Sequence, residues 1–170
     1  MEKARIALTG FMGVGKTSVA RHLANALGVK RLDLDHYIEQ KTGRKIPAII
    51  EADGEAAYRT IETEYLSLAL ADKDITILSL GGGVWTLPEN RQLINQEKMI
   101  SVWLESTFEH CWQNIRNSKK ERPLAKDRDA AIKLFEERQK HYCLADLHII
   151  IRPEHSSYDI AQEIKEQVFL

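Results

Sequence analysis

A glycine-rich loop near the start of the chain carries the strongest chemical signal. Residues 10–17 (GFMGVGKT) match the phosphate-binding pattern G-x-x-x-x-G-K-[ST]. In such a loop, backbone N–H groups surround a di- or triphosphate, the lysine adds positive charge, and the hydroxyl residue is a ligand for Mg²⁺. We therefore expect a nucleotide site made of Gly13, Val14, Gly15, Lys16, Thr17 and Ser18.

Two acids follow the second apolar stretch of the chain. Asp33 and Asp35 are separated by one residue, so in an extended strand both carboxylates would point to the same face. Near a phosphate loop, one acid can hold Mg²⁺ through water while the other orients and deprotonates an acceptor hydroxyl. The alternative is that these acids cap a helix starting near His36, since aspartate is a favourable cap.

Two further features could have either a functional or a purely structural role. Arg59 and Glu62 share a helical face, either as a surface ion pair or as a carboxylate that holds a guanidinium for an anionic substrate. Three consecutive glycines, Gly81, Gly82 and Gly83, end the third apolar stretch. They suit a ligand that lies against bare main chain, although a flexible turn would also use them.

A charged segment, residues 116–129, lacks an apolar period and contains Pro123. It is either a solvated surface loop or a mobile lid that brings a cation to the transferring phosphoryl group. Proline restrains the residue before it to extended geometry, which can aim Arg122 inward. Arg138, in the helix expected next, is either a second guanidinium for an anionic substrate or a solvated helix residue.

These residues need a scaffold, and the apolar pattern predicts one. Strands are expected at residues 5–9, 30–35, 75–80, 99–104 and 147–152. Helices are expected after the phosphate loop, where Gly28 is a helix stop, and at 55–71, 106–117, 129–144 and 156–169. Strands that alternate with helices predict a three-layer α/β/α domain, in which helices cover both faces of a five-stranded parallel sheet. The site then lies at the carboxyl ends of the strands.

Size and composition restrict the class of protein. With 170 residues and 44% hydrophobic content, the chain suits a single domain, residues 1–170. A net charge of −1 provides no broad attraction to nucleic acid or to an anionic membrane. The first strand begins too early for a signal peptide, and no apolar run approaches the roughly 18 residues of a membrane span. A soluble, cytoplasmic protein with two reduced thiols is therefore expected.

Taken together, the ordered motifs resemble the shikimate kinase family. The resemblance rests on GFMGxGKT at the loop, D-x-D at 33–35, G-E-x-x-[aromatic]-R-x-x-E at 54–62, GGG at 81–83, R-P-L at 122–124 and R-x-x-x-Y at 138–142. It implies a phosphate-loop kinase fold with strand order 2-3-1-4-5, a substrate-binding excursion at about 33–62 and a lid at about 112–128. It also implies a relationship to nucleoside monophosphate kinases.

The resemblance also implies the reaction, the transfer of the ATP γ-phosphoryl group to the 3-hydroxyl of shikimate in aromatic amino-acid biosynthesis. Its implied catalytic residues are Lys16, Asp35 and Arg122, with Asp35 as the base and as a ligand of the substrate hydroxyls. Thr17 and Asp33 would hold magnesium. The remaining implied contacts are Arg59 and Arg138 for the carboxylate, Gly81, Gly82 and Gly83 along the ring, and Arg116, Arg152 and Pro153 around adenine. A monomer without nucleic-acid or membrane partners is expected.

The chain departs from the family pattern at three positions. The two aromatic positions that commonly wall the substrate pocket correspond to Ile50 and Tyr58, and the family's R-P-L-L is R-P-L-A at Ala125. A kinase for another polyhydroxy acid, such as gluconate, is therefore the enzymatic alternative. The alternative outside enzymes is a nucleotide-binding module without catalysis. A nucleoside monophosphate kinase would need a base-reading pocket that the sequence does not indicate.

Overall fold

Five parallel strands form one sheet in the computed structural model of the chain, which describes residues 3–170. Their order across the sheet is β2-β3-β1-β4-β5. The strands are β1 (Ile6–Thr9), β2 (Lys30–Asp33), β3 (Ile75–Ser79), β4 (Ile100–Glu105) and β5 (Leu147–Ile150). The sheet type, strand number and strand order expected from the sequence are confirmed.

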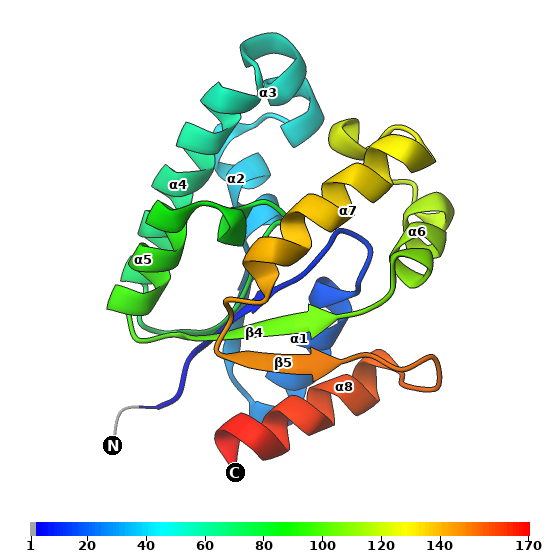
Figure 1. Cartoon of the computed structure of the whole chain (residues 1–170). Coiled ribbons are helices and arrows are strands. Elements are labelled where there is room, and N and C mark those ends of the chain that lie inside the picture. Colours follow the sequence, from blue (N-terminus) through cyan, green and yellow to red (C-terminus); the bar gives the residue numbers. More distant parts are fainter. Residues whose placement is uncertain (1–2) are drawn as a thin grey trace.

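Helices cover both faces of this sheet (Figure 1). On one face, α1 (Lys16–Leu27) packs against α8 (Ser157–Ile164), which a π-helical turn, Lys165–Phe169, continues. On the other face lie α4 (Glu55–Ala71), α5 (Pro88–Gln96) and α7 (Arg128–Tyr142). Three further helices lie toward the carboxyl ends of the strands, α2 (Leu34–Thr42), α3 (Ile46–Asp53) and α6 (Phe108–Asn117). No helix within residues 3–170 is long and apolar enough to cross a membrane.

The burial of the strands explains their composition. Every residue of β1 and of β3 is buried, because each of these strands has a neighbour on both sides and helices on both faces. Such strands need near-continuous apolar side chains. At the edge of the sheet, β5 instead alternates, with Ile149 buried and both His148 and Ile150 exposed.

The second strand is shorter than the sequence predicts. β2 ends at Asp33, whose carboxylate accepts a hydrogen bond from the His36 N–H (3.2 Å) and caps α2. Asp35 therefore lies in the first turn of α2 and not in the strand. The prediction that the two carboxylates share one face of an extended strand is therefore wrong. The alternative, in which an acid caps the following helix, is correct for Asp33. The helix α2 was predicted only as part of that capping alternative, and α3 and α5 were not predicted.

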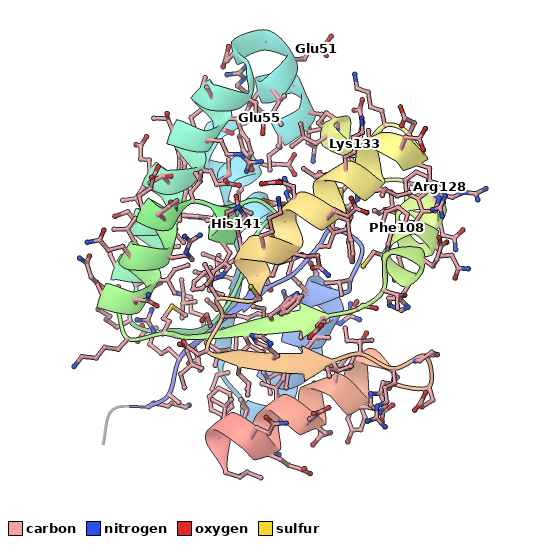
Figure 2. The ribbon with its side chains drawn as sticks, in the orientation of Figure 1. Glu51, Glu55, Phe108, Arg128, Lys133 and His141 are labelled. Atoms are coloured by element: carbon pink, nitrogen blue, oxygen red, sulfur yellow. The ribbon has the colours of Figure 1, made fainter. Side chains whose placement is uncertain are left out.

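The predicted lid lies between two helices that are held together. α6 continues to Asn117 and α7 begins at Arg128, so only residues 118–127 lack α-helix, and Pro123–Ala125 form a single 3₁₀ turn. The Arg128 guanidinium lies 5.0 Å from the centre of the Phe108 ring and also pairs with Glu109 (Figure 2). These contacts join the first turns of α6 and α7. They anchor the C-terminal end of residues 118–127, which are called the lid below.

Candidate active site

The phosphate loop connects β1 to α1 in a conformation that requires glycine. Gly13 has a φ of 79° and Gly15, which caps α1, a φ of 108°. A Cβ on Gly13 would lie 2.6 Å from the Cys111 carbonyl oxygen of α6, so the loop and that helix are in direct contact. The Asn114 side chain, also of α6, donates to the Gly13 carbonyl (2.8 Å). The first N–H groups of α1 have no partner within the helix, which makes this end an anion site.

Lys16 is folded back over the loop. Its ammonium donates to the carbonyl oxygens of Gly10 (2.6 Å) and Phe11 (3.1 Å). Burial, and after it repulsion from Arg122, lowers the pKa of Lys16 to about 7. A phosphate beside this nitrogen would favour the charged form, because an opposite charge counteracts desolvation. Lys16 is therefore placed to add positive charge where a nucleotide's phosphates approach α1.

Thr17 and Asp33 form a pair of oxygen donors beside the loop. The Thr17 hydroxyl donates to Asp33 Oδ2 across 2.8 Å. A hydroxyl and a carboxylate are the hard ligands that Mg²⁺ prefers in phosphoryl-transfer sites. Within residues 3–170 there is no cluster of three His, Cys, Asp or Glu side chains suited to a metal. Mg²⁺ in such sites usually keeps several waters and binds substrate phosphates, so one carboxylate and one hydroxyl from the protein could hold it.

Two cavities meet at the carboxyl ends of the strands. The larger, of about 1090 Å³, extends between α2, α3 and α4 and the lid. The smaller, of about 530 Å³, lies over the phosphate loop. The residues that line both cavities are Met12, Thr17, Asp33, Asp35, Gly81, Gly82, Lys120 and Arg122. The predicted base and the predicted lid cation therefore lie at the boundary between a phosphate cavity and a second, more spacious cavity.

Asp35 is mostly enclosed by protein. Its Oδ1 is buried and accepts no hydrogen bond from the described residues, whereas its Oδ2 lies 3.6 Å from the Lys120 ammonium. Desolvation by burial raises the pKa of Asp35; Lys120 lowers it, Asp33 raises it, and Lys16 lowers it. A carboxylate held in this way is suited to accept a proton from a bound hydroxyl.

The three consecutive glycines are needed because side chains of the site lie directly against them. A Cβ on Gly81 would lie 2.6 Å from Asp35 Oδ1. One on Gly82 would lie 2.8 Å from the Arg138 guanidinium, and one on Gly83 would lie 2.5 Å from that of Arg59. None of the three has a positive φ, so close approach is the requirement and not an unusual backbone. The glycine run therefore brings one acid and two cations together.

Arg59 pairs with a buried carboxylate, that of Glu62, so the surface ion-pair alternative is wrong. The Arg59 guanidinium donates to Glu62 Oε1 (2.7 Å), and the Tyr58 hydroxyl donates to Glu62 Oε2 (2.9 Å). Glu62 is 1% exposed. Burial raises the pKa of Glu62, and the Arg59 charge opposes that shift. Because both carboxylate oxygens are used, Glu62 holds the guanidinium in one orientation at the wall of the larger cavity.

Arg138 is 5% exposed and lines the larger cavity, so the solvated-helix alternative is wrong for it as well. One turn later on α7, the Tyr142 hydroxyl donates to the Gly82 carbonyl (2.5 Å). The sequence motif includes Tyr142 but does not predict this contact. The spacing of four residues places Tyr142 on the same helical face as Arg138, which could have indicated that both side chains face the site.

The wall of the smaller cavity differs from the prediction. Arg116, Arg152 and Pro153 are exposed and line neither cavity, so their contact with adenine stays a prediction. The side chains that line the cavity away from the loop include His110 and Asn114 of α6, and His155 and Ser156 before α8. No motif in the sequence indicates these four positions, because they meet only when α6 and α8 pack around the loop.

A phosphate loop on a parallel sheet of this order, facing an acid and two buried guanidinium groups across a shared cavity, defines a phosphate-loop kinase of small molecules. The shikimate kinase family profile matches residues 12–169. Shikimate kinase of Enterococcus faecalis is 38% identical over 166 residues, covering 96% of this chain and 97% of its own. Shikimate kinase of Acinetobacter baumannii, solved in complex with shikimate, superposes with a TM-score of 0.88 at 37% identity, covering 97% of this chain and 92% of its own.

A further relative, the shikimate kinase of Parasynechococcus marenigrum, is 41% identical over 150 residues, which cover 86% of this chain and 77% of its own. Each of these matches spans most of both proteins. The chain therefore belongs to the shikimate kinase family and is an ATP-dependent phosphotransferase.

Proposed function

We propose that this chain transfers the γ-phosphoryl group of ATP to the 3-hydroxyl of shikimate, a step of aromatic amino-acid biosynthesis. One observation carries the proposal. Asp35 lines both cavities, and Arg59 and Arg138 line the larger cavity but not the smaller one over the phosphate loop. This is the arrangement that an alcohol with a carboxylate requires, if its hydroxyl is to face a nucleotide.

The two arginines would bind the acceptor carboxylate. The Arg138 guanidinium lies against Gly82 and that of Arg59 against Gly83, and Arg59 is also held by Glu62. A planar guanidinium can offer two parallel N–H groups to a carboxylate, so two of them fix both position and orientation. Gly81, Gly82 and Gly83 would then lie along the acceptor ring.

Asp35 would orient the hydroxyl and take its proton. As the oxygen of the hydroxyl bonds to the γ-phosphorus, the bond from that phosphorus to the β–γ bridging oxygen breaks, ADP leaves, and the hydroxyl proton passes to Asp35. Lys16 and Arg122 would offset the charge that spreads over the phosphoryl oxygens. Thr17 and Asp33 would hold Mg²⁺, which when bound contributes further positive charge at the phosphates.

The lid would exclude water from this reaction. Lid residues 119–124 line the larger cavity, and the lid is anchored at α6 and α7. Water competes with the acceptor as a nucleophile, so a lid that closes over the acceptor favours transfer over hydrolysis. All of these groups belong to one chain, so a monomer acting on a small molecule is sufficient for the proposed activity. A cytoplasmic location is part of the same proposal.

The test is a survey of acceptors with the purified chain. ADP release is measured with Mg²⁺-ATP and either shikimate, gluconate or no acceptor, and the product is identified by mass spectrometry. We expect turnover with shikimate, with the phosphate on the 3-hydroxyl. Turnover with gluconate and none with shikimate would instead establish the other polyhydroxy-acid kinase. ATP binding without turnover on any acid would establish a nucleotide-binding module.

A further inference from the structure

The lid brings two cations to the boundary between the cavities. One is Arg122, which has a role in the reaction proposed above. The other is Lys120, which lines both cavities and has no role so far. Its ammonium lies 3.6 Å from Asp35 Oδ2, and its side chain is 52% exposed. The residue thus contacts the proposed base directly, although it lies on a segment without α-helix.

The oxygen that Lys120 contacts is the one that an acceptor needs. Asp35 Oδ1 is buried, and a Cβ on Gly81 would lie 2.6 Å from it. A hydroxyl in the larger cavity must therefore reach Asp35 at Oδ2, where the ammonium already lies. At 3.6 Å the contact is an ion pair without a short hydrogen bond, and half-exposed pairs of this kind are easily exchanged.

We propose that Lys120 changes partner during the reaction. It pairs with Asp35 Oδ2 before the acceptor binds, yields that oxygen to the acceptor hydroxyl, and then places its ammonium beside the transferring phosphoryl group. The inference rests on the proposed function. Lys120 lines both cavities from its present backbone position, so a rotation of its side chain is enough to move the charge. A lysine suits this task, because its ammonium is a point charge on a flexible stem.

The exchange predicts an unusual combination of effects. A residue that simply grips the acceptor would weaken acceptor binding when it is removed. Lys120 opposes acceptor binding in the ground state and stabilises the transition state. Its removal should therefore strengthen acceptor binding and at the same time lower kcat, a combination that marks the loss of a competing ground-state contact.

The experiment compares the intact enzyme with Lys120→Met, Lys120→Arg and Lys126→Met. Methionine keeps the length of the side chain without the charge, and arginine restores the charge. Lys126 is an exposed lysine of the same lid that lines neither cavity, which makes it the matched control. Shikimate binding without nucleotide is measured by calorimetry, and kcat is measured with both substrates saturating.

For Lys120→Met we expect shikimate binding tighter by about two- to fivefold, the range of half-exposed ion pairs. We expect kcat lower by about ten- to a hundredfold, because one cation is missing from the transition state. Lys120→Arg should recover most of kcat, and Lys126→Met should match the parent enzyme. Weaker or unchanged shikimate binding in Lys120→Met, or an unchanged kcat, would overturn the proposal. A parent enzyme without shikimate turnover would instead contradict the proposed function.

Discussion

The hydroxyl of Tyr58 donates to Glu62 Oε2 across 2.9 Å, on the carboxylate whose other oxygen accepts from Arg59. The three residues lie on α4 and line the larger cavity, with Tyr58 and Glu62 buried. The Tyr58 ring thus adds a hydrogen-bond donor at the wall of this cavity. The hydroxyl therefore helps to fix the Glu62 carboxylate, which in turn holds Arg59, one of the two arginines proposed to bind the acceptor carboxylate.

Tyr58→Phe should weaken acceptor binding. The substitution keeps the ring but leaves the buried Oε2 of Glu62 without its donor, so Arg59 is held less firmly. We expect the acceptor KM to rise about fivefold, corresponding to ~1 kcal/mol for a buried hydrogen bond, with little change in kcat. Tyr65→Phe, on the same helix with its ring against Tyr37, is the control and should leave both constants unchanged. An unchanged KM in Tyr58→Phe would show that Glu62 holds Arg59 in place without the hydrogen bond from Tyr58.

Asp35→Asn should abolish most of the turnover without affecting the nucleotide. The amide is similar in shape to the carboxylate but cannot accept the hydroxyl proton, so kcat should fall by about a hundredfold or more. The Kd for ATP, measured by calorimetry, should stay within about twofold of the parent value, because the phosphate loop is untouched. Asp74→Asn, an exposed acid just before β3, serves as the control. Near-normal turnover in Asp35→Asn would exclude Asp35 as the base.

Asp33→Asn should raise the requirement for magnesium. Asparagine is as good a helix cap as aspartate, so α2 should keep its start, whereas the metal loses a negative ligand or water-holding group. We expect the Mg²⁺ concentration for half-maximal activity to rise about ten- to a hundredfold, the usual effect of losing such a group. Mn²⁺ binding in the presence of ADP, followed by electron paramagnetic resonance, should weaken in parallel. Unaltered Mn²⁺ binding would place the metal elsewhere.

The two thiols should differ sharply in reactivity. Burial raises the pKa of the Cys111 thiol to about 11, whereas Cys143 is exposed. At about pH 8, only about one Cys111 thiol in a thousand would be the reactive thiolate, even before its burial is considered. A disulfide reagent should therefore modify one thiol per chain quickly and the second only after unfolding. Cys143→Ser should remove the fast phase, and two fast thiols in the parent protein would contradict the buried position of Cys111.

The sequence by itself predicted the sheet, and most of the site residues it predicted line the two cavities. The apolar runs of β1 and β3 favour strands covered on both faces, and the loop pattern that includes Lys16 indicates an anion site after β1. The spacing of motifs along the chain was enough for the resemblance to shikimate kinase, because each motif follows a particular strand or lies in a particular excursion.

Only the tertiary structure decided between the alternatives that sequence spacing left open. Whether Arg59, Glu62 and Arg138 are solvated or buried depends on what packs over them, and helical periodicity does not report burial. The need for three glycines becomes clear only from Asp35, Arg59 and Arg138, which approach them from three different helices, α2, α4 and α7. Likewise, the contact between Lys120 and Asp35 joins residues 85 positions apart, and no local pattern can encode a contact that forms only when the lid meets α2.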